Sequence, residues 1–181
     1  MQRSHHGEPA DGQPGRAAPQ IDALNADTQL VTVTIGGNDV NYLGSLNTYS
    51  CQTSGGANCG EVNQDAINQS MAELPDRMKN VVNTIHTVAP QATVLLVNYV
   101  TILPDTDVCA GVPLTGDQLA FENSIATRVA DATANAATEA GATLVDLAGA
   151  SHGHDACSAE PWVENYTPRP GAPRTTRTRP G

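Results

Sequence analysis

The order of apolar and polar positions divides the middle of the chain into strands and helices. Residues 30–35 (LVTVTI) are mostly β-branched and end at two glycines, which predicts a strand. Residues 92–100 (ATVLLVNYV) form a nearly continuous apolar run, as expected of a buried parallel strand. Residues 142–147 (ATLVDL) predict a third strand, and residues 21–27 are interpreted as the end of a helix.

Two longer segments show the periodicity of helices. In the first, apolar side chains recur at steps of three and four positions: Ile67, Met71, Leu74, Met78, Val81 and Ile85. Pro75 lies inside this segment and predicts either two helices or a kinked one. Residues 117–140 are rich in alanine with one apolar face, and Gly141 is expected to end that helix. Residues 44–60 and 103–116, rich in Ser, Gly, Asn, Pro and Asp, are predicted to be loops.

The predicted order of elements is strand, helix, strand, helix, strand. This order is typical of an α/β fold with a parallel sheet and helices on both of its faces. Ligands of such sheets bind at the carboxyl ends of the strands. In this chain those ends are residues 36–39, 98–101 and 146–155, so we expect functional residues there.

Charge is unevenly distributed along the 181 residues. The net charge is −10, which argues against nucleic acid and anionic membrane surfaces as partners. Most of the basic residues lie near the two ends: Arg3, Arg16, Arg169, Arg174, Arg177 and Arg179. Residues 1–16 and 169–181 therefore predict disordered tails around one folded domain of residues 17–168. A polyanion-binding role for the C-terminal arginines is the functional alternative.

The four cysteines include no CxxC pair, which disfavours zinc-ribbon and thioredoxin-like sites. An even number of cysteines in an acidic chain suits two disulfides and an oxidising compartment. We expect Cys51 to pair with Cys59 and Cys109 with Cys157, with four free thiols in a cytosolic protein as the alternative. Residues 1–16 hold no apolar signal-peptide segment, so a secreted protein would lack the start of its gene product. No transmembrane segment is expected.

The sequence Gly36-Gly37-Asn38-Asp39 directly follows the first predicted strand. Two glycines allow a tight turn that brings backbone N–H groups close to a ligand. The Asn38 side-chain amide, at the carboxyl end of a strand, can donate a hydrogen bond to a developing oxyanion. The alternative is an ordinary strand–helix turn in which Asp39 caps the next helix.

Residues 151–157 offer a second candidate cluster. Potential metal ligands there are His152, His154, Asp155 and Cys157. A disulfide cysteine beside loop histidines is the simpler interpretation of this spacing. Ser151 lacks the surroundings of a nucleophile elbow. We therefore predict neither a metal site nor a cofactor.

Several of these features occur together in one known family. The run VTVTIGGNDV is followed by a short Cys–Cys loop, a VLLVNY strand, the Cys109 loop, an alanine-rich helix and HGHDACSAEPWV. Over residues 17–168 this arrangement resembles the SGNH/GDSL hydrolases, and in particular their secreted bacterial lipase and esterase branch. The resemblance implies a flavodoxin-like α/β/α fold and a monomeric enzyme that hydrolyses lipid or short-acyl carboxylic esters without a cofactor.

In that family a Ser nucleophile and a His base act with oxyanion donors from a Gly block and an Asn block. By resemblance, Asn38 matches the Asn block and Gly36 is its glycine, so both are predicted to be catalytic. Gly37 and Trp162 are predicted to contact the substrate. Ordinary packing is the alternative for Trp162.

The chain departs from the family near both of its ends. It contains no GDS sequence for the nucleophile and no HPN or DxxH sequence for the base. With freely chosen GC-rich codons, a shift of reading frame converts the start of the chain into CSGATTANLL and its end into HHPNAAG, which resemble the family's Gly and His blocks. We therefore expect a truncated, frame-shifted SGNH domain with little esterase activity, a decayed gene fragment. A non-catalytic binding module and a metal-binding protein are the alternatives.

Overall fold

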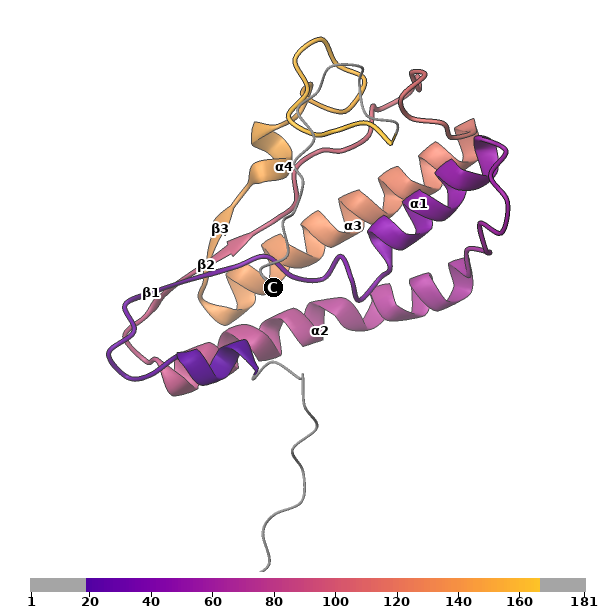
Figure 1. Ribbon diagram of the computed structural model, residues 1–181. Coiled ribbons are helices and arrows are strands. Elements are labelled where there is room, and N and C mark those ends of the chain that lie inside the picture. The colour runs from indigo at the N-terminus through magenta and orange to yellow at the C-terminus, as the bar shows by residue number, and fades with distance from the viewer. Residues whose placement is uncertain (1–18, 167–181) are drawn as a thin grey trace, which may run out of the picture.

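The computed structural model describes residues 19–166, so the predicted tails, residues 1–16 and 169–181, lie outside the described residues. A three-stranded parallel sheet in the order β1-β2-β3 runs through the described part (Figure 1). Its strands are β1 (Leu30–Val33), β2 (Thr93–Val97) and β3 (Thr143–Val145). All three predicted strands are present, each shorter than its apolar run, and the α/β class is confirmed.

The register of the sheet brings the carboxyl ends of the strands to one edge. Leu30 aligns with Thr93 between β1 and β2, and Leu95 aligns with Thr143 between β2 and β3. Because both pairings are parallel, the segments that follow the three strands leave the sheet on the same side. Candidate residues that are far apart in sequence can therefore meet at this edge.

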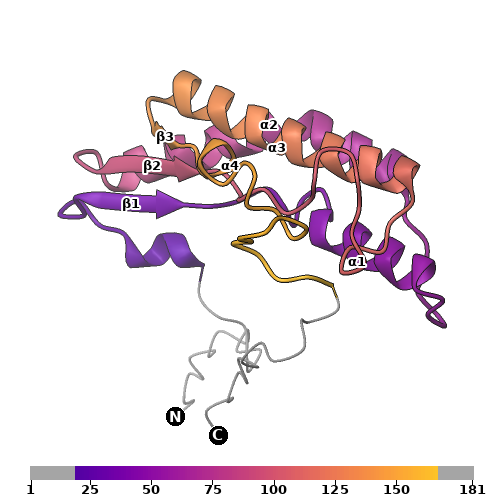
Figure 2. The same cartoon turned by 90° about the horizontal axis from the view of Figure 1, so that it is seen from above.

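Two long helices, α2 (Gln64–Val88) and α3 (Gly116–Ala140), pack against each other on the same face of the sheet (Figure 2). Val94 and Leu96 of β2 point into the core beneath them, whereas Leu30 and Thr32 of β1 are exposed. Within residues 19–166, both long helices therefore lie on one face of the sheet, and the second face is not covered by a long helix. The strands lie side by side in chain order, so both crossover connections run across the sheet in the same direction. Because such connections are right-handed, their helices lie on the same face of the sheet.

Helix α1 (Tyr42–Thr53) occupies most of the segment that was predicted to be a loop, so that prediction was wrong for residues 44–53. Its buried face includes Ser45 and Ser50 beside Tyr42 and Tyr49. Small serines allow close packing but carry no apolar signal, so the sequence shows no helical period here.

Pro75 does not divide α2, which continues from Gln64 to Val88 as one helix. A proline inside a helix costs about 3 kcal/mol through the lost hydrogen bond and the clash of its ring. The apolar face stays in phase across it, with Met71 and Leu74 before it and Met78 after it all buried. Burial of this continuous face offsets the local cost.

The ends of α3 and two short helical segments complete the described fold. Helix α3 begins with a capping box at Thr115 and Gln118, and Gly141 ends it in the left-handed conformation (φ 74°), as predicted. The first helical segment is a short 3-10 turn, η1 (Gln20–Ala23), rather than the end of a helix reaching residue 27. A short helix, α4 (Leu147–Ala150), follows β3.

Both predicted disulfides are present. Cys51 and Cys59 lie 5.6 Å apart (Cα–Cα) and close the loop after α1. Cys109 and Cys157, 5.5 Å apart, join the loop before α3 to the segment after α4. Among the described helices, none combines the length and apolar composition needed to cross a bilayer.

The side chain of Glu122 is fully buried where α3 packs on α1. Neither of its carboxyl oxygens has a hydrogen-bond partner among the described residues. The Ser45 hydroxyl nearby donates to the carbonyl oxygen of Tyr42 at 3.0 Å. Burial raises the pKa of Glu122 to about 7. The folded chain therefore holds this carboxyl neutral up to a higher pH than the unfolded chain does.

This difference in pKa predicts that the stability of the folded chain decreases as the pH rises. Below about pH 4.5 the carboxyl is protonated in both states and adds no pH dependence to stability. Between about pH 4.5 and 7 only the folded state keeps the proton, so stability is progressively lost as the pH rises. Glu122→Gln should therefore raise the Tm by an amount that grows across this window and then levels off. Thermal unfolding at several pH values, with the exposed Glu61→Gln as control, measures it. A constant difference between Glu122→Gln and the original chain would contradict the assignment.

Candidate functional site

The Gly36-Gly37-Asn38-Asp39 turn leaves β1 at the carboxyl edge of the sheet. Gly36 has φ +103°, a conformation that residues with side chains rarely adopt. A Cβ atom at this position would also overlap the end of the Met78 side chain and lie 3.3 Å from Leu74, both on α2. The backbone conformation therefore favours glycine at residue 36, and any side chain there would also have to displace the end of Met78.

Tyr99 holds the second glycine of the turn from the opposite side. The backbone N–H of Gly37 donates to the Tyr99 hydroxyl at 3.1 Å, and a Cβ on Gly37 would lie 3.0 Å from that ring. The carbonyl oxygen of Gly37 accepts from the backbone N–H of Tyr42 at 2.9 Å. Sequence reasoning missed Tyr99 as a site residue, although it directly follows a strand whose end was expected to be functional.

Asp39 does not cap α1, so that interpretation was wrong. Its carboxylate accepts from Arg77 of α2 at 3.1 Å, and Arg77 also pairs with Glu73 at 2.6 Å. The position before α1 is taken by Asn41 in the left-handed conformation (φ 51°), without a side-chain cap. The Arg77 pair adds a third contact between the turn and the rest of the fold, although an exposed pair contributes little free energy.

The side chain of Asn38 is exposed and makes no hydrogen bond to a described residue. Only its backbone takes part, with its carbonyl oxygen accepting from the N–H of Asn41 at 3.2 Å. A primary amide in this state keeps both of its N–H donors available to a ligand oxygen. The turn thus fixes the backbone of Asn38 while its amide stays free.

Trp162 is not part of the hydrophobic core. It is 58% exposed, and its ring stacks on His154 with centroids 4.3 Å apart. It lines neither the α3 cavity nor the α1 groove, the two cavities described below. Its contact with a substrate stays a prediction.

The cluster at residues 151–157 is engaged in local contacts. Cys157 is in a disulfide, His152 pairs with Asp105 at 3.3 Å, and Nδ1 of His154 lies 2.7 Å from a backbone carbonyl oxygen. Ser151 is fully buried and accepts from the N–H of Thr101 at 2.8 Å. Within the described residues, no group of three or more His, Cys, Asp or Glu is placed to hold a metal ion.

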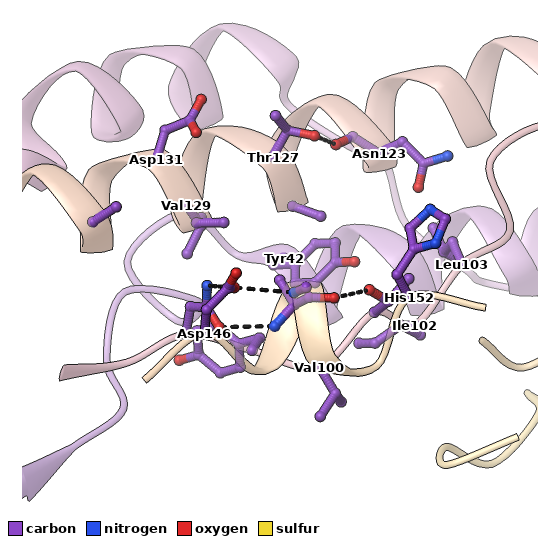
Figure 3. Close-up of a pocket in the computed structure, with 18 of the residues that line it drawn as sticks. Tyr42, Val100, Ile102, Leu103, Asn123, Thr127, Val129, Asp131, Asp146 and His152 are labelled. Atoms are coloured by element: carbon purple, nitrogen blue, oxygen red, sulfur yellow. Dashed lines mark hydrogen bonds between the residues drawn. The ribbon is translucent and has the colours of Figure 1, made fainter. Parts of the chain in front are cut away.

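Two cavities open near the carboxyl edge of the sheet. The larger, which we call the α3 cavity, has a volume of about 560 Å³ (Figure 3). It lies between α3 and the two segments that follow β2 and β3. The smaller, the α1 groove, has about 360 Å³ and lies between α1 and residues 163–166. Leu43 and Leu46, five and eight residues after Asn38, line the α1 groove.

The parallel α/β sheet, with a glycine-rich turn and a free asparagine amide at a strand end, agrees with the resemblance to the SGNH/GDSL hydrolases that the sequence suggested. The family model of the GDSL-like Lipase/Acylhydrolase family matches residues 3–170 of this sequence. The chain belongs to that family.

Relatives of known activity agree with this assignment. The chain is 35% identical over 158 residues to Lipase 2 of Streptomyces coelicolor, covering 81% of this chain and 54% of that protein. It is 30% identical over 150 residues to a lipase of Streptomyces rimosus, covering 83% of this chain and 55% of that protein. The chain thus spans about half the length of these relatives.

Solved structures show the same fold. The extracellular lipase of Streptomyces rimosus superposes with a TM-score of 0.66 at 28% identity, covering 82% of this chain and 62% of that one. The phospholipase A1 of Streptomyces albidoflavus gives a TM-score of 0.67 at 27% identity, covering 83% and 66%.

The packing around the turn predicts a large effect for Gly36→Ala. The new methyl group must displace the end of Met78, and the backbone of an alanine must keep a φ that alanine disfavours. The variant should therefore lose about 2–4 kcal/mol of unfolding free energy. Gly55→Ala is the matched control: its φ is +73° but nothing lies within 4 Å, so only the backbone cost remains. Urea unfolding of both variants measures the difference. Equal losses would show that Met78 does not confine the turn.

Proposed function

We propose that residues 19–166 carry the Asn38 oxyanion donor of a serine-dependent ester hydrolase. The observation that supports this is the free Asn38 amide, held at the end of β1 by a turn that α2, β2 and α1 all contact. An amide with no internal partner is available to a substrate. Gly36 and Gly37 act by permitting the turn.

The chemistry of acyl transfer requires such a donor. When a nucleophile attacks an ester carbonyl, negative charge develops on the oxygen, and N–H groups already in place stabilise it without reorganising. The loss of one such donor typically costs about 10²–10³ in rate. A neutral asparagine amide donates at any pH at which the protein is folded.

The sequence has no GDS, HPN or DxxH motif to supply the nucleophile and the base. We infer that the 181-residue chain by itself hydrolyses esters at a small fraction of the rate of its relatives. The substrates of the complete site are carboxylic esters, since the similar proteins are two lipases and a phospholipase A1. The two disulfides support an extracellular site of action, like that of the Streptomyces rimosus enzyme.

A non-catalytic binding module is the second candidate. It is favoured by the combination of an ordered turn, two cavities and the missing nucleophile motif. Such a module would be stabilised by an ester that is not consumed, and its Tm would rise with ester concentration.

The activity proposal is tested in a hybrid that restores the missing blocks. Residues 19–166 are joined to the N-terminal and C-terminal segments of Lipase 2 of Streptomyces coelicolor, and hydrolysis of p-nitrophenyl butyrate is measured. The hybrid should be active while the original chain is nearly inactive. Asn38→Ala in the hybrid should lower kcat by about 10²–10³, because one oxyanion donor is lost.

The control is Asn47→Ala, since Asn47 is an asparagine of α1 whose amide bonds to the Leu43 carbonyl oxygen. It should leave kcat nearly unchanged. If Asn38→Ala behaves like Asn47→Ala in an active hybrid, Asn38 is not an oxyanion donor.

A further inference from the structure

The α3 cavity is a second possible ligand site, separate from the free Asn38 amide. Its volume of about 560 Å³ is within the range of small-molecule pockets. Asn38 does not line it. Figure 3 shows Asn123 and Thr127 of α3 on one side, Asp146 on the other, and Tyr42 between them.

The lining combines an aliphatic wall with acidic groups. The apolar part includes Val100, Ile102, Leu103, Val129 and Leu144. Three carboxylates lie around it, those of Asp105, Asp131 and Asp146. His152 is the one basic side chain of the lining, and it pairs with Asp105. The cavity therefore favours an apolar body and disfavours an anion.

Tyr42 supplies an independent indication of a ligand. Only 3% of the surface of Tyr42 is exposed, yet its hydroxyl makes no hydrogen bond to a described residue. Burial raises the pKa of this phenol above its usual range, so the hydroxyl keeps its proton. Among the described residues, only the carboxyl oxygens of Glu122 are fully buried without a partner, so the Tyr42 hydroxyl oxygen is not sealed inside the core. Because Tyr42 lines the cavity, its hydroxyl can bond to a ligand there.

Asp146 provides the fixed negative charge. Its Oδ1 accepts from the side chain of Asn98 at 2.8 Å and from the N–H of Gly149 at 3.0 Å. These bonds lower the pKa of Asp146, so it is ionised at neutral pH. The second oxygen, Oδ2, makes no hydrogen bond to a described residue and is available to a cation.

We propose that the α3 cavity binds an organic ammonium ion with an apolar body. The apolar part lies against the aliphatic wall, the cationic head lies beside Asp146, and Tyr42 meets the ligand inside the cavity. This site does not depend on the proposed role of Asn38. It does adjoin the turn, because Tyr42 and Tyr99 both line the cavity and both hydrogen-bond to Gly37.

Three probes with the same eight-carbon tail test the head-group preference: octyltrimethylammonium, octyl sulfate and octyl glucoside. Binding to the full chain is measured by calorimetry below the micelle concentration of each probe. The ammonium probe should bind at least about tenfold more tightly than the sulfate probe, with the glucoside between them. In an NMR titration, the ammonium probe should shift the Gly37 amide resonance.

Variants locate the site. Asp146→Asn keeps the acceptor oxygen for Asn98 and Gly149 but removes the charge, and should weaken ammonium binding several-fold. Asp155→Asn is the matched control, because Asp155 likewise accepts a nearby backbone N–H, from Cys157 at 2.8 Å, outside the cavity. Ala130→Phe should block binding of all three probes.

Circular dichroism confirms that each variant is folded before its affinity is compared, and Asp146→Asn keeps the test decisive if Ala130→Phe fails to fold. Equal affinity for the ammonium and sulfate probes would overturn the proposal. So would unchanged ammonium binding in Asp146→Asn, or no binding by the folded original chain.

Discussion

The structure depends on the narrow space through which the chain passes after β1. Gly36 lies against Met78 of α2, and Gly37 lies against the ring and hydroxyl of Tyr99 after β2. A side chain at either position would have to displace Met78 or Tyr99, so these two contacts restrict the path of the turn. That path sets the start of α1, leaves Asn38 facing solvent, and places Tyr42 in the wall of the α3 cavity. The contacts of Gly36 and Gly37 with these two side chains thus position both Asn38 and the α3 cavity.

The sequence was most informative where a local rule decides the structure. Short apolar runs rich in β-branched residues identified the three strands, and Gly141 marked the end of α3, because strand preference and left-handed φ are properties of single residues. The turn with Asn38 could be singled out because it follows a strand. The partners of the turn could not: Tyr99 is 62 residues from Gly37, and Arg77 is 38 residues from Asp39. Their contacts exist only in the folded chain.

The errors in the fold have the same physical origin. Helix α1 was missed because its buried face uses Ser45 and Ser50, which pack closely without an apolar signal. Pro75 indicated either a division or a kink of α2, and only the division is wrong. The local cost of proline is visible in the sequence, while the packing of α2 on α3 that offsets it is not. The placement of both long helices on one face follows from strand order, which periodicity does not report. Glu122, fully buried without a hydrogen-bond partner, is likewise a product of tertiary packing.

Tyr99 holds the turn that presents Asn38, and the rate of amide hydrogen exchange at Gly37 reports on this contact. In the original chain the Gly37 N–H is buried and bonded to the Tyr99 hydroxyl, so it should exchange slowly. Tyr99→Phe removes only that hydroxyl, and Gly37 should then exchange at least about tenfold faster while amides of α2 and α3 keep their rates. An unchanged Gly37 rate in Tyr99→Phe would contradict the account, because the turn would then be held by something other than this contact.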